Sequence, residues 1–320
     1  MAQRCVVLGL LPSAGAEMLR AAGVEVEIIG DPGTVDLHAK VVDVDAIIAR
    51  TSPIPAALID AAPRLRIVAR YGVGYDNIDV PALTRRRIPL ATIGNVNAVP
   101  VAEQTMALLL GLSRRLGAYD RASREGRWAI RETLTIWELA AKTIAIIGLG
   151  RIGRAVAKRC LAFDMKVIAV DPAVTDATMA AAGVRRVATL RDALVQADIV
   201  TLHLPLSAET RNMLGAPEFA AMKPGSVLIN AARGGIVDEA ALAASLRNGH
   251  LAGAGLDVLA QEPPPADHPL LGLDNVVISP HSAALTAECA IRMSLACAEN
   301  VLGAFTGRLD RSRVINPEVL

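Results

Sequence analysis

Three polar residues in the last third of the chain have types that could move a proton and hold an anion. Arg233, Glu262 and His281 each come a few residues after a short apolar run. Histidine exchanges a proton near neutral pH, and a carboxylate beside it favours the imidazolium form. An arginine can grip a carboxylate with two hydrogen bonds and polarise a carbonyl oxygen. The set predicts proton transfer at an oxygen atom of a small carboxylic acid.

A glycine-rich turn in the middle of the chain could bind a phosphate. An apolar run leads into Gly148-Leu-Gly150-Arg-Ile-Gly153, and a helical pattern follows. In such a turn the first glycine permits the tight bend, the second lets the backbone approach a pyrophosphate, and the third lets the helix pack on the strand. The free N–H groups of Arg151 and Ile152, at the helix N-terminus, would bind the anion. The turn predicts a dinucleotide site.

An acidic residue after the next apolar run favours one form of the dinucleotide. Asp171 lies 21 residues after Gly150, close to the spacing of the acid that accepts hydrogen bonds from the ribose hydroxyls. A carboxylate there repels a 2′-phosphate, and Pro172-Ala173-Val174 brings no arginine to offset it. We therefore predict NAD rather than NADP as the cofactor.

Together, the dinucleotide site and the three polar residues predict hydride transfer on a 2-hydroxy or 2-oxo acid. Hydride passes between C4 of the nicotinamide and C2 of the acid, while a proton passes to or from the oxygen on C2. Ligands of parallel sheets bind at the carboxyl ends of the strands, where all three residues are expected. We expect His203 to support the cofactor pocket, and we expect His268, in a loop before Pro269, to be an ordinary loop residue.

The elements that must position these residues alternate between β-type runs and helical patterns, as in parallel α/β sheets. The first hundred residues contain one such series and no glycine-rich turn. A long helix is predicted over Val101–Arg124, and the polar stretch Glu125–Glu138 separates it from the second series. Six strands are predicted from Thr143 onward, the count of a doubly wound dinucleotide fold. A last helix, Thr286–Phe305, is expected to return the chain to the first domain.

Composition excludes several other classes of protein. Apolar residues make up 52% of the chain and aromatic residues 2%, so the core must be aliphatic, as suits α/β folds. A net charge of +1 and few aromatic side chains give no basis for nucleic-acid binding. No apolar run is long enough to cross a membrane and no signal peptide is apparent, so we expect a cytoplasmic protein. The four cysteines form no C-x-x-C pair, and we expect small buried side chains in a reducing compartment and no metal site; they are Cys5, Cys160, Cys289 and Cys297.

The sequence resembles the D-2-hydroxyacid dehydrogenase family over nearly its whole length. The segment Arg70–Asp79, which reads Arg-Tyr-Gly-Val-Gly-Tyr-Asp-Asn-Ile-Asp, is most similar to the phosphoglycerate dehydrogenase and hydroxypyruvate reductase branches. The other motifs that carry the resemblance are Gly148–Gly153 with Asp171, Leu202–Pro205, Asn230–Asp238, Leu256–Pro263 and Pro280-His281.

The resemblance implies two doubly wound parallel-sheet domains. A Rossmann NAD-binding domain, residues 101–284, would be inserted in a flavodoxin-like substrate domain made of residues 1–100 and 285–320. The resemblance also implies a homodimer formed largely through the cofactor domain. It implies that Arg233, Glu262 and His281 are the catalytic residues, in the cleft between the domains.

The resemblance further assigns binding residues. Backbone N–H groups of Val73 and Gly74 would hold the substrate carboxylate. Arg50 and Arg70 fall where the phosphoglycerate branch carries arginines that face a phosphate, and Arg131 could be a third, lent by the other subunit; ordinary ion pairs are the alternative for all three. The implied cofactor contacts are Val73, Gly148, Gly150, Arg151, Ile152, Gly153, Asp171, Leu204, Pro205, Ala231, Ala232, Arg233, Asp257, His281 and Ala283.

The leading hypothesis is an NAD-dependent D-2-hydroxyacid dehydrogenase, with 3-phosphoglycerate and phosphohydroxypyruvate as one possible substrate pair. The alternative within enzymes is a hydroxypyruvate or glyoxylate reductase. A formate dehydrogenase is disfavoured, because that branch pairs its histidine with glutamine and this chain has Glu262. An alternative of a different class is an NAD-sensing protein, like the corepressors that share this fold. The chain stops at Leu320, so we expect no appended regulatory domain.

Overall fold

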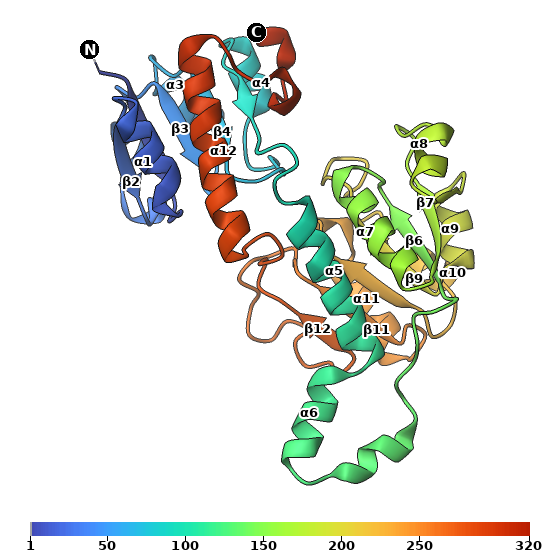
Figure 1. Ribbon diagram of the computed structural model, residues 1–320. Helices are drawn as coiled ribbons and strands as arrows, with labels where there is room; N and C mark the ends of the chain where they lie inside the picture. Colours follow the sequence, from blue (N-terminus) through green and yellow to red (C-terminus); the bar gives the residue numbers. More distant parts are fainter. Residues whose placement is uncertain (1) are drawn as a thin grey trace. The chain divides into compact units, whose positions relative to one another are not determined.

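A computed structural model describes residues 2–320 and divides the chain into two compact units (Figure 1). Unit 1 consists of Met1–Asn97 with Leu285–Leu320, and unit 2 is Ala98–Ala284. Each unit holds one parallel sheet with helices, so the predicted α/β class with two parallel sheets is confirmed.

The sheet of unit 1 has five parallel strands in the order β2-β1-β3-β4-β5, which is the flavodoxin-like order. Its last helix, α12, packs against α1 and β4, so the two ends of the chain belong to one unit. The strands are β1 (Arg4–Leu8), β2 (Glu25–Ile29), β3 (Ala46–Ala49), β4 (Ile67–Arg70) and β5 (Leu90–Ala91). The helices are α1 (Ser13–Ala21), α2 (Leu37–Val41), α3 (Ala56–Asp60), α4 (Val80–Arg85) and α12 (Ala287–Thr306).

The sheet of unit 2 has seven parallel strands in the order β12-β11-β10-β9-β6-β7-β8. The strand order reverses between β6 and β9, and the crevice outside the carboxyl ends of these two strands is where such sheets bind ligands. The strands are β6 (Thr143–Ile147), β7 (Lys166–Val170), β8 (Arg185–Arg186), β9 (Ile199–Leu202), β10 (Val227–Asn230), β11 (Gly253–Leu256) and β12 (Val276–Ile278). The α-helices are α5 (Ala98–Ser113), α6 (Leu116–Arg124), α7 (Arg151–Ala162), α8 (Asp176–Ala181), α9 (Leu190–Gln196), α10 (Ala216–Ala221) and α11 (Glu239–Arg247).

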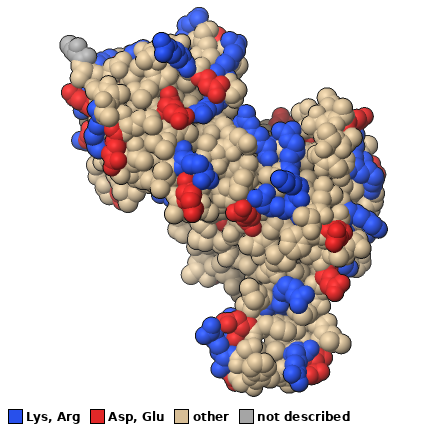
Figure 2. Space-filling model, in the orientation of Figure 1, with Lys and Arg blue, Asp and Glu red and all other residues tan. Residues whose placement is uncertain are grey.

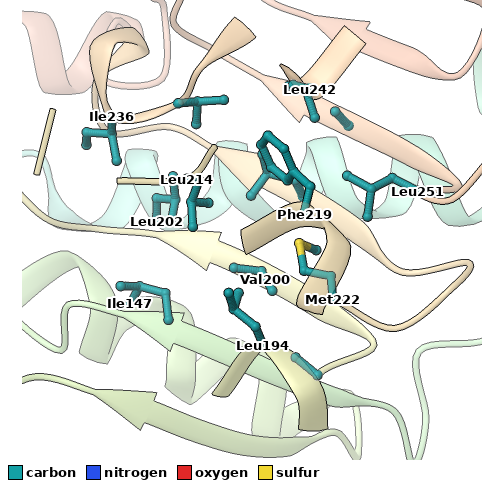
Figure 3. Close-up of a cluster of buried hydrophobic side chains, with 14 of the residues drawn as sticks. Ile147, Leu194, Val200, Leu202, Leu214, Phe219, Met222, Ile236, Leu242 and Leu251 are labelled. Atoms are coloured by element: carbon teal, nitrogen blue, oxygen red, sulfur yellow. The ribbon is translucent and has the colours of Figure 1, made fainter. Parts of the chain in front are cut away.

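Helices cover both faces of this sheet, which explains why its central strands are apolar throughout. In β6, Ile144 and Ile146 join a buried cluster with α5 and α7, whereas Ala145 and Ile147 join the cluster under α9, α10 and α11. Figure 3 shows the second cluster, with Phe219 of α10 surrounded by aliphatic side chains. All four cysteines of the chain are buried and unpaired, as expected from the sequence.

The predicted helix over Val101–Arg124 is wrong, because the structure has two helices, α5 and α6, in its place. The break lies at Arg115, whose backbone has a left-handed φ of 47°. The carbonyl of Ser113 accepts a hydrogen bond from the N–H of Trp137 at 3.0 Å, so the returning chain binds a group that would otherwise continue the helix. This tertiary contact outweighs the local helical pattern.

The prediction of six strands in unit 2 is also incorrect, because β8 adds a seventh. This strand has two residues, Arg185 and Arg186, and it pairs with β7 at the edge of the sheet. Two arginines carry no apolar strand pattern, so pairing with β7 rather than local preference forms the strand.

Candidate active site

The glycine turn after β6 is shaped by two close backbone contacts. Gly148 has a φ of 94°, and a Cβ there would lie 2.5 Å from the carbonyl oxygen of His203, which follows β9. A Cβ on Gly153 would lie 2.2 Å from the carbonyl oxygen of Gly148, whereas nothing lies within 4 Å of one on Gly150. The first and third glycines are therefore required for packing, and the middle one faces open space at the switch point of the sheet.

The start of α7 and the carboxylate of Asp171 suit the other parts of a dinucleotide. Gly150 is the N-cap residue of α7 and provides no side-chain hydrogen bond, so the first N–H groups of the helix remain available to an anion. The carboxylate of Asp171 accepts hydrogen bonds from the N–H of Leu149 at 2.8 Å and of Ala173 at 2.9 Å. These bonds hold the carboxylate beside the glycine turn, where it can accept ribose hydroxyls. The residues present fit NAD.

Arg186 also belongs to this region, and sequence reasoning missed it. Its Nη1 donates to the backbone oxygen of Asp171 at 3.1 Å, and its other nitrogens contact the carbonyl of Val174 and the carboxylate of Asp176. Arg186 therefore braces the loop after β7. No signal near Asp171 could have revealed it, because it comes from the short strand β8.

The three predicted catalytic residues follow three neighbouring strands. Arg233 follows β10, Glu262 follows β11 and His281 follows β12, and these strands are adjacent and parallel. Nδ1 of His281 lies 2.6 Å from Oε2 of Glu262. An ionised carboxylate only accepts hydrogen bonds, so Nδ1 carries the proton and Nε2 is left to exchange one. The structure thus brings Glu262 and His281 together as a hydrogen-bonded Glu–His pair.

Burial and neighbouring charges shift the pKa of Glu262 in opposite directions. Its partial burial would raise the pKa of the carboxyl, but the hydrogen bond and charge of His281 lower it. The backbone N–H of Leu259, which donates to Oε1 at 3.1 Å, and the charge of Arg233 lower the pKa further. The net result is a pKa below the ordinary value, so Glu262 is ionised at neutral pH.

Asp257 holds the segment that carries His281. Its carboxylate is buried and accepts hydrogen bonds from Ser279 Oγ at 2.6 Å, from Ser282 N–H at 3.0 Å and from Ala283 N–H at 2.9 Å. The N–H of His281 donates to the carbonyl of Asp257 at 2.7 Å, and His281 itself has a left-handed φ of 49°. A cofactor contact by Asp257 remains a prediction, while its contacts in the structure orient the histidine.

Arg233 stands on a turn fixed by Asn230. The side chain of Asn230 accepts the N–H of Ala232 at 3.0 Å and donates to the carbonyl of Arg233 at 2.8 Å. The guanidinium of Arg233 donates from Nη1 to the carbonyl of Ala232 at 2.7 Å. These bonds keep the arginine at the same edge of the sheet as the Glu–His pair.

His203 does not have the environment of an acid–base residue. Desolvation by burial lowers its pKa to about 3, so the ring is neutral. Nε2 lies 2.9 Å from Thr201 Oγ1, and Nδ1 has no partner within the part of the chain that the structure describes. A supporting role in the cofactor pocket remains the prediction for this residue.

The predicted substrate residues Arg50, Arg70, Val73 and Gly74 belong to unit 1, whereas Arg131 belongs to unit 2. Arg70, the last residue of β4, donates to the carbonyl oxygens of Gly74 and Tyr71, both at 2.7 Å. Arg50 follows β3 and donates to the carbonyl of Leu10 at 3.2 Å. Arg131, in the 3₁₀ helix Trp128–Thr133 of unit 2, forms an exposed ion pair with Glu132. Arg70 thus supports the loop of Val73 and Gly74, and phosphate binding by these arginines remains untested.

No helix in residues 2–320 is both long and apolar enough to cross a membrane. The same range contains no group of three or more His, Cys, Asp or Glu side chains arranged to hold a metal ion.

Comparison with known proteins identifies the family. The model described as "D-isomer specific 2-hydroxyacid dehydrogenase, NAD binding domain" matches residues 106–283. The chain belongs to the D-isomer specific 2-hydroxyacid dehydrogenase family, and unit 2 carries the NAD-binding domain of that family. The resemblance drawn from the motifs and the prediction of NAD are both confirmed.

Individual relatives carry several names. The chain is 40% identical to D-3-phosphoglycerate dehydrogenase of Archaeoglobus fulgidus over 304 residues, which are 95% of this chain and 57% of that protein. It is 37% identical to glyoxylate reductase of Thermofilum pendens over 98% of this chain and 94% of that one. A solved D-lactate dehydrogenase of Aquifex aeolicus, complexed with NAD and lactic acid, is 26% identical with a TM-score of 0.89, over 98% and 99% of the two chains. The chain therefore spans little more than half the length of the phosphoglycerate dehydrogenases it matches.

Proposed function

We propose that this protein is an NAD-dependent D-2-hydroxyacid dehydrogenase that transfers hydride between NAD(H) and a small 2-hydroxy or 2-oxo acid. The observation that carries the proposal is the 2.6 Å contact between His281 Nδ1 and Glu262 Oε2. This pair lies at the carboxyl edge of the same sheet that presents the glycine turn at Gly148. The D preference follows from membership of the family.

In this proposal His281 is the residue that exchanges the proton on the substrate oxygen. Bound NAD supplies the hydride acceptor, and NADH the donor. With Nδ1 held by Glu262, the imidazolium of His281 gives a proton from Nε2 during reduction, and the neutral ring takes one during oxidation. The carboxylate of Glu262 stabilises the imidazolium and fixes the orientation of the ring. Arg233 would hold the substrate carboxylate and polarise the carbonyl through its charged donors.

We propose 3-phosphoglycerate and phosphohydroxypyruvate as the first candidate pair, since several relatives at 40–42% identity are D-3-phosphoglycerate dehydrogenases. Hydroxypyruvate or glyoxylate is the second candidate, because the match to a glyoxylate reductase extends over 94% of that protein. The hydrogen bonds of Arg70 to its own loop favour this second reading, since they occupy donors that a phosphate would need.

An NADH oxidation assay over a panel of 2-oxo acids tests the substrate. The panel contains phosphohydroxypyruvate, hydroxypyruvate, glyoxylate, pyruvate and bulkier 2-oxo acids. If the phosphate matters, Arg50→Gln should raise KM for phosphohydroxypyruvate by about tenfold and leave KM for glyoxylate unchanged. Arg64→Gln is the matched control in the same unit, because Arg64 pairs with Asp45 at 2.8 Å. Equal kcat/KM for the phosphorylated and plain acids would exclude the first candidate.

His281→Ala separates an enzyme from an NAD-sensing protein that shares the fold. We expect turnover to fall by about 100- to 10,000-fold, the usual range for a general acid–base group. NADH affinity, measured by fluorescence titration, should stay within about threefold, because the glycine turn and Asp171 are untouched. Unchanged turnover would contradict the assignment of His281, and no turnover in the parent protein with any acid of the panel would favour the sensor.

We also propose a homodimer formed through unit 2. The segment from α6 through Trp128–Thr133 to Leu134 forms an arm that extends from this unit, and charges of both signs are mixed on it (Figures 1 and 2). A cavity of about 1010 Å³ lies between the arm and the first residues of β10, β11 and β12. Leu116, Trp128 and Leu134 are 66%, 64% and 84% exposed on the arm. A second copy is the occupant that fits, because a two-fold interface places the same arm and cavity on both partners.

Light scattering after gel filtration tests the dimer. Leu134→Glu should shift the protein from dimer to monomer, because it places a charge among the exposed apolar side chains of the arm that the proposed interface would bury. Leu10→Glu, at an exposed leucine of unit 1, should leave the mass unchanged. A parent protein of monomer mass would contradict the proposal.

We propose a cytoplasmic location for this protein. Four buried cysteines that form no disulfide support it, because disulfides are rare in the reducing cytoplasm.

A further inference from the structure

A second glutamate–histidine pair lies near the Glu–His pair of the site and is more deeply buried. His268 Nε2 lies 3.0 Å from Oε2 of Glu239, the first residue of α11. The two side chains are 11% and 13% exposed, whereas those of His281 and Glu262 are 45% and 38% exposed. His268 lies in a loop, as expected, and its pairing with Glu239 is the feature that the sequence did not indicate.

This second pair holds the loop that carries Glu262. The other carboxylate oxygen of Glu239 accepts the backbone N–H of Ala260 at 2.7 Å. The neighbouring N–H, that of Leu259, donates to the carboxylate of Glu262. Further along the loop, Nδ1 of His268 accepts the N–H of Leu270 at 3.4 Å, which leaves the proton on Nε2 to donate to Glu239. One carboxylate thus ties together two segments of the loop, one at Ala260 and one at His268.

The same loop also touches the turn that carries Arg233. A Cβ on Gly234 would lie 2.0 Å from the carbonyl carbon of Leu259, so the backbones of the turn and the loop are in contact. Leu259 and Leu270 are buried in the cluster under α11, and Arg247 of α11 donates to the carbonyl of Pro269 at 3.0 Å. The first and last residues of helix α11, Glu239 and Arg247, therefore both form hydrogen bonds with the loop.

We infer that Glu239 and His268 are positioning residues that hold Glu262 against His281. The inference rests on the proposed function, because it concerns the pair that is proposed to exchange the proton. Neither residue is among those that the sequence or the resemblance assigns to the site. The charged group in contact with His281 is the carboxylate of Glu262, on which the charge of Arg233 also acts, whereas the carboxylate of Asp257 accepts hydrogen bonds from Ser279, Ser282 and Ala283.

The test compares Glu239→Ala with Glu239→Gln and His268→Ala. In Glu239→Ala and His268→Ala, kcat for 2-oxo acid reduction should fall on the order of tenfold, because displacing a catalytic group by less than 1 Å has effects of this size. The alkaline limit of activity should move to lower pH as Glu262 leaves His281. Glu239→Gln should restore only part of the rate, since its amide oxygen still accepts from Ala260 while its amide nitrogen faces the protonated Nε2 of His268. NADH affinity should not change.

Glu218→Ala is the matched control. Glu218 also lies in the first turn of a helix of unit 2, α10, and accepts a backbone N–H, that of Gly215, at 3.0 Å. Thermal melts should show a similar loss of stability in Glu218→Ala and Glu239→Ala, but only Glu239→Ala should move the pH limit. If neither Glu239→Ala nor His268→Ala moves it while Glu262→Gln does, the positioning role is wrong and the proposed function stands. If Glu262→Gln also leaves it unmoved, the proposed Glu–His pairing fails and the inference falls with it.

Discussion

Replacing Glu262 by glutamine isolates the electrostatic contribution of the Glu–His pair. The amide has nearly the same shape as the carboxylate, and its oxygen can still accept the proton on His281 Nδ1 at the 2.6 Å position. The substitution therefore removes the negative charge and keeps the contact with His281, at the cost of the hydrogen bond that Leu259 N–H donates to the other carboxylate oxygen. Because the pKa of Glu262 lies below its ordinary value, the carboxylate is charged throughout the range in which a histidine titrates.

The size of the effect follows from the separation and the exposure of the two side chains. Two unit charges about 4 Å apart attract by about 1 kcal/mol in water and by about 4 kcal/mol at an effective dielectric constant near 20. The side chains of His281 and Glu262 are 45% and 38% exposed, so the lower part of this range applies, about 1–2 kcal/mol. Since about 1.4 kcal/mol corresponds to a factor of ten, loss of this attraction should lower the rate of reduction at alkaline pH by about tenfold relative to the parent.

Reduction of a 2-oxo acid consumes a proton, and in the proposed mechanism the imidazolium of His281 supplies it, so the rate declines as pH rises. Without the charge of Glu262 the imidazolium is less stable, so the decline should occur at lower pH than in the parent. The assay is kcat for NADH oxidation between about pH 5 and pH 10 at saturating substrate, with Glu218→Gln as the control. A decline at the same pH in Glu262→Gln and the parent would refute the electrostatic reasoning, whatever the loss of rate.

Two other predictions concern the cofactor. Asp171→Asn should raise kcat/KM with NADPH relative to NADH by about tenfold, since it removes the charge that repels a 2′-phosphate and leaves Arg186 nearby. Steady-state assays with both cofactors measure this ratio. An unchanged ratio would show that another feature selects the cofactor. Gly153→Ala should lower both the melting temperature and NADH affinity, with a cost of about 1–3 kcal/mol, because its Cβ would lie 2.2 Å from a carbonyl oxygen. Gly150→Ala, which has open space, should weaken NADH binding and leave the melting temperature unchanged; equal melting temperatures for the two variants would contradict the packing argument.

Much of the fold follows from local patterns in the sequence. The apolar strands of both sheets are visible because helices bury them on both faces, so their residues are apolar without alternation. Two features were predicted incorrectly for the same physical reason, which is that a distant segment forms them. Trp137 ends α5 by binding the carbonyl of Ser113, and pairing with β7 makes a strand of Arg185 and Arg186.

The candidate site was predictable to the extent that its residues follow strand ends. A motif after each of β10, β11 and β12 places Arg233, Glu262 and His281 at one edge, but strand order and the 2.6 Å contact are properties of the folded sheet. Glu239 could not be recognised in this way. Its partners Ala260 and His268 lie 21 and 29 residues further along the chain, and no spacing rule links them.

The length of the β11–β12 connection explains why such partners are needed. Nineteen residues, 257–275, separate the two strands without a helix or strand of their own, and loops of that length are otherwise uncommon in compact domains. Ordering each loop residue costs about 1–2 kcal/mol of backbone entropy, so a glutamate on such a loop needs many contacts to stay within hydrogen-bonding distance of His281. The contacts come from Glu239, His268 and two buried leucines rather than from residues that could do chemistry. Because Glu262 lies on this long loop, the geometry of the proposed Glu–His pair depends on the structural residues that hold the loop, and we expect those residues to be sensitive positions for activity.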